Sequence, residues 1–256
     1  MTQDENTKVG EVLPTYPSGT TLEDTALRTL LALPPSLIRR VSLSLKKLVS
    51  LGYIHVGTCF SGCDMLHHAL QFMSRAWKLL FNIHINFDLR FQCESDVGKQ
   101  VFLVSEVPAS PQLFNDAAEL GSTLALNVKT QRREAVPWVS LLVAGFSCVD
   151  KSPLNIHSHK NKQCIQRQTG QSGETFSCIA KYIRLTLASV VVLENLREMF
   201  QTDGNDISDA EYVVEFLKSL GYCNVMSILT KAQDHGSRAV RVRAFFVGLR
   251  RPATHS

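Results

Sequence analysis

The chain has 256 residues, of which 45% are hydrophobic and 20% charged, and it contains 14 glycines and 9 prolines. This composition excludes a disordered, collagen-like or coiled-coil chain and is typical of a globular protein with a sizeable core. The 27 lysines and arginines and 23 acidic residues give a net charge of +4, which permits a polyanionic partner without requiring one.

Cysteine usage and hydropathy indicate the compartment. Seven cysteines are an odd number, and residues 1–8 are polar rather than a basic and then apolar leader. We therefore expect an intracellular protein, nuclear in a eukaryote and otherwise cytoplasmic. Even the apolar stretch 138–149 is shorter than the roughly 18 residues that span a bilayer, so we predict no membrane-spanning segment.

The chain divides into three predicted regions. Residues 1–19 lack periodicity and contain prolines and glycine, which is typical of a flexible tail. Residues 20–52 contain two amphipathic helices separated by a pair of prolines. The second of these helices carries the basic residues Arg39, Arg40, Lys46 and Lys47. That basic face is either solvated or approaches a phosphate backbone. Residues 53–256 form the third and largest region, a separate domain with a different pattern.

In this third region, short β-rich runs alternate with helical patterns. The expected strands are residues 53–57, 86–94, 112–115, 139–143, 190–193, 224–229 and 244–249. The expected helices are residues 64–79, 96–104, 174–187 and 208–220. The alternation predicts an α/β fold with a mostly parallel sheet flanked by helices. Ligand sites in such sheets lie beyond the carboxyl ends of the strands, so the residues following each strand are the candidates.

Three candidates follow the first three expected strands. Gly57 and Gly62 bracket a turn that allows a ligand to approach a helix N-terminus, although a purely structural turn is the alternative. Glu94 ends the second strand, where a carboxylate accepts hydrogen bonds from ribose hydroxyls; a solvent-facing glutamate is the alternative. Asp116 follows the third strand, with a helix N-cap as its alternative role.

The later strands bring a potential nucleophile and charged side chains. Cys148 follows the fourth strand, and the nearby Lys151 would lower the pKa of its thiol; a buried structural thiol is the alternative. Glu194 follows the fifth strand. Arg241 and Arg243 precede the last strand and alternate so that both side chains share one face.

The order and spacing of these blocks resemble the cytosine-5 DNA methyltransferases. The family's Asp-Leu-Phe-Ala-Gly type turn, its Gly-x-Pro-Cys-Gln block, its Glu-Asn-Val block and its Gln-x-Arg-x-Arg block each have a counterpart. The counterparts are residues 58–62, 145–149, 194–196 and 239–243, together with Glu94 and Asp116. The resemblance runs from about residue 53 to residue 248 and implies a Rossmann-like fold that binds S-adenosylmethionine.

The resemblance also implies a reaction, the transfer of a methyl group to carbon 5 of cytosine in DNA. Cys148 would add to carbon 6 of the ring while Glu194 holds and protonates nitrogen 3. Arg243 would hold the exocyclic oxygen, and Arg241 would support Glu194. Because a stacked base hides its ring faces, the cytosine must be flipped out or already single-stranded.

A cofactor site is implied in the same way. Phe60 would pack on the adenine of S-adenosylmethionine beside the Gly62 turn, Glu94 would bind the ribose hydroxyls, and Asp116 would accept from the adenine amino group. The polar segment 150–173 would be the mobile loop that closes over the flipped base.

The chain departs from the family at several positions. Ser147 replaces the proline before the nucleophile, Val149 and Ala239 replace glutamines, and Asp64 stands where a second glycine is common. Eight residues follow Gly248, whereas the family continues into a target-recognition region and a final motif. We therefore expect a short form, with target recognition absent or supplied by a partner chain, in which the two N-terminal helices fill the vacant packing position in the sheet.

Other chemistries have weaker support. His157, His159 and Cys164 offer three metal ligands without a fourth, so we assign no metal site. Cys148 with His235 would form a hydrolase pair, but that pair leaves the acids and arginines unexplained. The other six cysteines are expected to be packing residues or surface thiols.

Three functions stay open at this point. The first is methylation of DNA, and the second is the same chemistry on RNA such as tRNA. The third is a catalytically silent module that binds cofactor or a partner, which the departures at Ser147 and Ala239 favour. The joint presence of Cys148, Glu194 and Arg243 favours an enzyme, because a binding module does not need all three.

Overall fold

The structure is a computed structural model that describes residues 22–49, 52–106, 112–156, 163–202, 206–235 and 237–250. The strands are β1 (Ile54–Cys59), β2 (Phe87–Cys93), β3 (Gln112–Phe114), β4 (Leu124–Asn127), β5 (Arg132–Ala135), β6 (Leu141–Ala144), β7 (Val190–Leu196), β8 (Tyr222–Lys231) and β9 (Val242–Arg250). The α-helices are α1 (Leu22–Leu31), α2 (Pro35–Val49), α3 (Met65–Phe81), α4 (Val97–Glu106), α5 (Cys164–Arg167), α6 (Gly170–Thr186) and α7 (Asp209–Ser219). Short 3₁₀ turns are η1 (Ala117–Gly121), η3 (Arg197–Phe200) and η4 (Ala232–His235).

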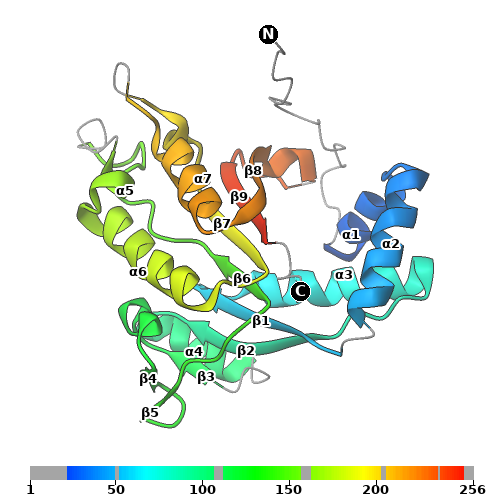
Figure 1. Cartoon of the computed structure of the whole chain (residues 1–256), viewed down its shortest axis with the longest axis horizontal. Helices are drawn as coiled ribbons and strands as arrows, with labels where there is room; N and C mark the ends of the chain where they lie inside the picture. The colour runs from blue at the N-terminus through cyan, green and yellow to red at the C-terminus, as the bar shows by residue number, and fades with distance from the viewer. Residues whose placement is uncertain are drawn as a thin grey trace.

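All of these strands join one sheet with the order β5-β4-β3-β2-β1-β6-β7-β9-β8 (Figure 1). The central strands β3, β2, β1, β6 and β7 are parallel, whereas β9 pairs antiparallel with both β7 and β8. The strand order reverses direction between β1 and β6, which is the topological switch point of a Rossmann-like sheet. The predicted α/β fold is confirmed.

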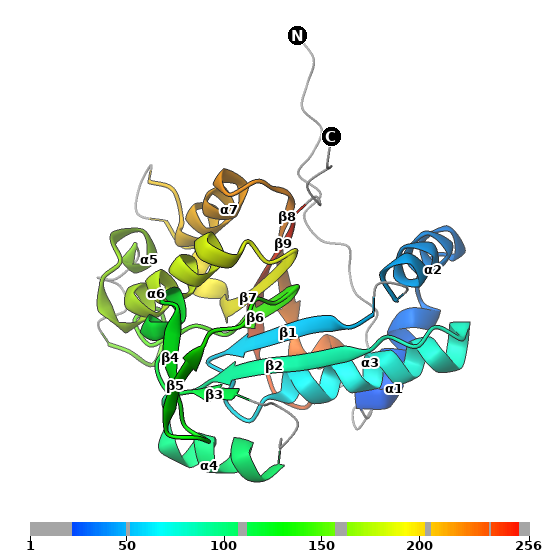
Figure 2. The ribbon, with the colours of Figure 1, turned by 60° about the horizontal axis from the view of Figure 1, so that its bottom comes forward.

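Helices cover the sheet from two sides. Figure 2 shows α3 and α4 on one side and α5, α6 and α7 on the other. On the first side Leu103 of α4 packs with Val56 and Leu89, and on the second side Phe176 and Ile179 of α6 lie in the largest core cluster. The carboxyl ends of the parallel strands therefore emerge between two helical layers.

A bulge in β2 changes the side of the sheet that its residues face. Val56 of β1 pairs with Leu89, but the next residue, Gly57, pairs with Phe91, so Arg90 has no opposite residue in β1. Leu89 consequently packs with α4, whereas Phe91 packs against Tyr182 of α6. Phe91 is fully buried and lies so close to Gly57 that a Cβ there would come within 2.4 Å of the ring.

Several predicted boundaries differ from the structure. The strand predicted to end before Glu194 continues through it, because β7 pairs along its whole length with β9. The hairpin β4–β5 was missed, since the polar sequence of β5 lacks an apolar alternation and most of its side chains are exposed. The prediction of one long loop over residues 150–173 is wrong for its last part, where α5 and the start of α6 bury Cys164 and Ile165.

The N-terminal helices form as predicted, and α1 packs on α3. Ala26 and Leu30 of α1 are buried against Ala76 and Trp77 of α3, and both views place α1 and α2 beside the amino-terminal ends of β1 and β2 (Figures 1 and 2). Ile54 of β1 and Phe87 of β2 pack against the same cluster, so the hypothesis that these helices fill a packing position in the sheet stays a prediction. Over the described ranges no helix combines the length and apolarity needed to cross a membrane.

We predict that Gly57→Ala destabilises the fold by about 1–3 kcal/mol, because the new methyl group overlaps the buried Phe91 ring. Urea unfolding of the variant measures this loss. Combining the change with Phe91→Leu should recover part of it, since the smaller side chain makes room. Gly98→Ala is the control, because a Cβ there meets only Asp96, and an equal loss in both variants would contradict the packing argument.

Candidate active site

The nucleophile candidate Cys148 lies in a tight turn directly after β6. The backbone carbonyl of Cys148 accepts hydrogen bonds from the N–H of Lys151 at 3.1 Å and of Ser152 at 2.9 Å. The Cys148 side chain is half-buried, so it is sheltered from bulk water yet reachable. These two hydrogen bonds to the carbonyl of the candidate nucleophile therefore close the turn.

Side chains from two other elements hold the first half of this turn. Asn195 of β7 donates from Nδ2 to the carbonyl oxygens of Phe146 at 3.1 Å and Ser147 at 3.4 Å. The N–H of Ser147 donates to Oγ1 of Thr175 in α6 at 3.1 Å. Proline has no N–H, so the family's proline at this position could not make the hydrogen bond to Thr175. Serine thus exchanges a rigid ring for a hydrogen bond to α6.

Glu194 and Arg243 form an ion pair beside the turn. Nε of Arg243 lies 2.8 Å from Oε1 of Glu194, with both side chains about one-quarter exposed. Arg243 stands opposite Leu196 in the β7–β9 register, which makes it a diagonal neighbour of Glu194 within reach of a long side chain. The support for Glu194 predicted of Arg241 thus comes from Arg243, while Arg241 is exposed just before β9.

The Cys148 thiol has a raised pKa. Burial is the main cause; Arg243 and Arg241 act in the opposite direction, and Glu194 adds to the increase. The prediction that Lys151 gives the thiol a lowered pKa is wrong. The Lys151 side chain is 2% exposed and paired with a carboxylate of α7, so its charge is engaged away from the thiol.

Gly145 joins the nucleophile's turn to the neighbouring strand and to Glu194. Its N–H donates to the carbonyl of Cys59 at the end of β1, at 3.3 Å. A Cβ at position 145 would lie 3.2 Å from Oε2 of Glu194, closer than ordinary contact. A larger residue at position 145 would therefore have to displace the Glu194 carboxylate.

The cofactor candidates lie at the carboxyl ends of β1 and β2. Glu94 is 6% exposed, and its carboxylate accepts from the N–H of Gly62 at 2.8 Å and of Asp96 at 3.0 Å. Gly62 has φ +56°, which glycine adopts without strain. A carboxylate bound by two donors keeps acceptor capacity, so binding of ribose hydroxyls by Glu94 stays a prediction.

Two other candidates have local structural roles. Asp116 accepts from the N–H of Ala118 at 2.8 Å, which confirms the N-cap role; its side chain is otherwise exposed at the end of β3. Phe60 has φ +56° and is half-buried against the core beneath. Their contacts with an adenine stay predictions.

Asp64 explains one departure from the family. Its φ of +45° is left-handed, the conformation that the usual glycine would adopt easily. The Asp64 carboxylate accepts from the N–H of His67 at 3.3 Å, capping α3, and from Nε2 of Gln92 at 2.6 Å. Aspartate is tolerated because its side chain makes these bonds.

The structure brings the candidates together in two groups. The cofactor group follows β1, β2 and β3, and the catalytic group comes from β6, β7 and β9. The groups meet where β1 and β6 adjoin, at the switch point where such sheets bind ligands. A tight turn before α3 and carboxylates at two adjacent strand ends fit the polar groups of S-adenosylmethionine.

The alternative chemistries gain no support from the geometry. His157 and His159 lie outside the described residues, and no group of three metal-binding side chains occurs within them. Cys164 is buried next to Asp209. His235 is hydrogen-bonded to Thr230 at 2.6 Å. The charges acting on Cys148 belong to arginines and a glutamate, which does not favour a cysteine–histidine hydrolase.

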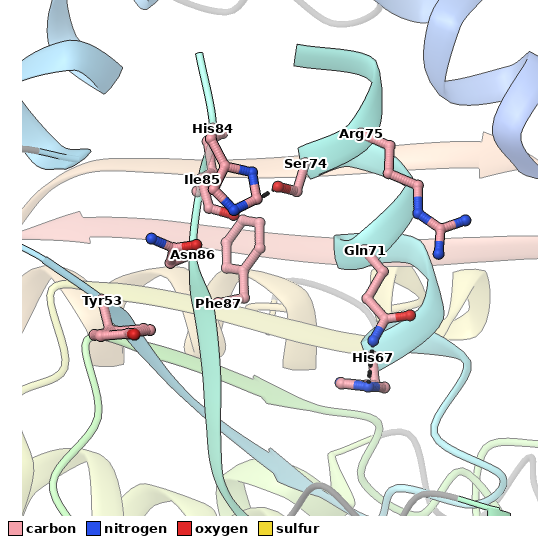
Figure 3. A pocket seen from close by; sticks show the side chains of 9 residues that line it. All are labelled: Tyr53, His67, Gln71, Ser74, Arg75, His84, Ile85, Asn86 and Phe87. Atoms are coloured by element: carbon pink, nitrogen blue, oxygen red, sulfur yellow. Dashed lines mark hydrogen bonds between the residues drawn. The ribbon is translucent and has the colours of Figure 1, made fainter. Parts of the chain in front are cut away.

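A separate pocket of about 280 Å³ lies beside the amino-terminal end of β2 (Figure 3). It lies between α3 and the segment 84–87 that leads into β2. Within it Ser74 donates to the carbonyl of Ile85 at 2.6 Å, and Gln71 is hydrogen-bonded to His67 at 2.9 Å. These side chains find hydrogen-bond partners within the pocket, which lies away from the strand carboxyl ends. We therefore do not place the cofactor in this pocket.

Three residues that support the site were missed in the sequence. Asn195 lies in the recognised Glu-Asn-Leu block, which was a usable signal. Thr175 and Asp209 lie in helical patterns without a distinguishing motif. Their contacts with the nucleophile's turn follow from the packing of α6 and α7 beside it.

The fold and this arrangement define a Rossmann-like domain of the methyltransferase class with a cysteine nucleophile candidate. Residues 117–256, more than half of the chain, match the family of C-5 cytosine-specific DNA methylases. The chain belongs to this family. The four sequence blocks described above, together with Glu94 and Asp116, agree with that membership.

Two fungal proteins are similar in sequence. Both are DNA (cytosine-5-)-methyltransferases DMT5. The protein of Cryptococcus neoformans var. grubii is 31% identical over 143 residues, which are 56% of this chain and 6% of that protein. The protein of Verticillium dahliae is 25% identical over 173 residues, which are 63% of this chain and 7% of that protein. The chain thus spans a small fraction of the length of these relatives.

Two solved structures are also similar. The S. pombe Dnmt2 methyltransferase aligns with a TM-score of 0.48 and 12% identity over 79% of this chain and 51% of that one. A methyltransferase assigned to DNA modification and encoded within a prophage (E. coli) aligns with a TM-score of 0.47 and 16% identity over 77% of this chain and 47% of that one.

We predict that Arg241→Ala raises the pKa of Cys148 further, because it removes a positive charge that favours the thiolate. The pH at which iodoacetamide alkylates Cys148 at half its maximal rate should move upward, as followed by mass spectrometry of the peptide containing Cys148. Glu194→Gln should move it downward, since a negative charge is lost. Shifts in the same direction would contradict this account of the charges.

We predict that Gly145→Ala leaves the free energy of unfolding within about 1 kcal/mol, since the group it meets is the flexible end of Glu194. The displaced carboxylate should nevertheless lower methyl transfer by about tenfold or more. Chemical unfolding and single-turnover methylation measure the two effects. Unchanged methylation would mean that the Glu194 position is not critical.

Proposed function

We propose that this domain transfers a methyl group from S-adenosylmethionine to carbon 5 of cytosine in DNA. The observation that carries the proposal is the half-buried Cys148 turn beside the Glu194–Arg243 ion pair, at the switch point of the sheet. Family membership supports cytosine-5 methylation, and the names of the two fungal relatives favour DNA.

Each side chain has a defined part in the proposed reaction. The sulfur of Cys148 forms a bond with carbon 6 of cytosine, and the displaced electron pair makes carbon 5 nucleophilic. Glu194 supplies a proton at ring nitrogen 3 and so stabilises the charge that develops there. Arg243 orients the Glu194 carboxyl through its Nε and faces the exocyclic oxygen, while Arg241 contributes positive charge at the mouth of the site. Loss of the carbon 5 proton and of the Cys148 sulfur releases the product.

The cofactor would be held by residues of the first three strand ends. Glu94 would accept from the ribose hydroxyls, Asp116 from the adenine amino group, and Phe60 would pack on the adenine beside the Gly62 turn. When bound, S-adenosylmethionine supplies the methyl group. Because Glu94 is already fixed by two backbone N–H groups, its carboxylate is oriented before the cofactor arrives.

The proposed substrate is a cytosine flipped out of the DNA helix, because the ring faces are hidden in the stack. The net charge of +4 is compatible with a polyanion. This substrate and the fungal relatives favour a nuclear location. Target recognition would come from another region of a longer protein or from a partner chain.

Covalent trapping tests the proposal. A fluorine at carbon 5 cannot leave as the proton does, so the enzyme should stay attached to DNA containing 5-fluorocytosine when S-adenosylmethionine is present. We expect an adduct on a denaturing gel that is lost in Cys148→Ala and kept in Cys63→Ala, which removes a different, exposed thiol.

The other outcomes of the experiment separate the competing functions. An adduct with the equivalent RNA alone would replace DNA by RNA as the substrate. No adduct with either polymer, in protein that binds S-adenosylmethionine by calorimetry, would favour the silent module. In that case the departures at Ser147 and Ala239 would be the first positions to examine.

A further inference from the structure

A buried ion pair lies behind the nucleophile's turn. Nζ of Lys151 lies 2.7 Å from Oδ2 of Asp209, and the two side chains are 2% and 0% exposed. Lys151 follows Cys148 by three residues, whereas Asp209 begins α7. The pair therefore joins the turn to a helix that is distant in the sequence.

Asp209 is fixed from several directions. Its carboxylate accepts from the N–H of Ile165 at 3.3 Å and of Gln166 at 3.1 Å, at the start of α5, and the thiol of Cys164 lies 3.8 Å away. Ser208 before it forms a capping box that sets the first turn of α7. The anion that faces Lys151 is thus held by two helical segments.

Lys151 is in turn bound to the nucleophile through its backbone. Its N–H donates to the carbonyl of Cys148, so moving the Lys151 side chain moves that hydrogen bond. Asp150 ties the same turn to α6, because its carboxylate accepts from the N–H of Ser172 at 2.7 Å and its own N–H donates to Oγ of Ser172 at 3.2 Å. The turn is held at its end by α6 and α7 together.

We propose that the Lys151–Asp209 pair is a positioning device that fixes the backbone of Cys148 for attack on the base. It replaces rigidity that the family obtains from the proline at the position of Ser147. Lys151 and Asp209 act through the turn and do not touch the substrate. This inference rests on the proposed function.

The physical argument concerns geometry more than stability. A buried ion pair gains little over apolar packing, but each charge must stay on its partner because burying it alone is costly. An aliphatic side chain at position 151 could slide within the core, whereas the ammonium is restricted to the Asp209 carboxylate. A displacement of about 1 Å of a reacting group lowers rates by as much as about 100-fold.

The test is the double variant Lys151→Gln with Asp209→Asn, which removes both charges and keeps a donor and an acceptor. The control is Arg133→Gln with Glu119→Gln, an ion pair of the same 2.7 Å length that joins β5 and η1 and is more exposed. For the double variant we expect kcat about tenfold to 100-fold lower with KM for S-adenosylmethionine and for DNA within about twofold. The control should keep both parameters.

Hydrogen exchange supplies a readout that does not need catalysis. In the double variant the amides of Lys151 and Ser152 should exchange about tenfold faster than in the unmodified chain, while those of β1 stay unchanged. Unchanged exchange at these amides would overturn the inference even if the unmodified chain proves inactive and the proposed function fails. Unchanged kcat in a folded double variant would overturn it as well.

If the double variant does not fold, hydrogen exchange in the unmodified chain tests the proposal instead. The amides of Lys151 and Ser152 should then show the same opening free energy as those of Ile165 and Gln166, because one ion pair holds both segments. Independent opening of the two segments would overturn the proposal.

Discussion

The parallel pairing of β1 with β6 is the constraint on which the site depends. It places the end of β1, with its turn into α3, directly beside the end of β6, with its turn into Cys148. The hydrogen bond from Gly145 to Cys59 closes this junction. The proposed cofactor site on one side of this junction and the proposed base site on the other therefore adjoin here.

The charges around Cys148 are balanced rather than strongly activating. Burial of the thiol favours the protonated form, and the two arginines only partly offset it, because Glu194 lies among them. Such an environment keeps the thiol mostly protonated until a bound substrate excludes water and brings its own polar groups to the sulfur. Reactivity would then depend on the complex, which limits reaction of the free thiol with small electrophiles.

The sequence predicted the residues at the strand ends better than those inside the strands. The positions of Glu94, Asp116 and Cys148 beyond strand ends could be predicted because apolar runs stop before them, while their roles stay predictions. Glu194 lies within β7, because antiparallel pairing with β9 lengthens the strand beyond its apolar run. The partnership of Lys151 with Asp209 could not be predicted, since nothing in a sequence reports which charges become buried together after helices pack.

The bulge at Arg90 has a consequence for how this strand can change in evolution. Before the bulge, alternate side chains of β2 face α4. After the bulge this alternation is inverted, and the strand leads to Glu94 with the inverted alternation. The two halves are therefore decoupled, and the packing half can be rebuilt without turning the carboxylate to the other side of the sheet. Removing the extra residue would do the reverse, inverting every side chain between the bulge and the site in a single step.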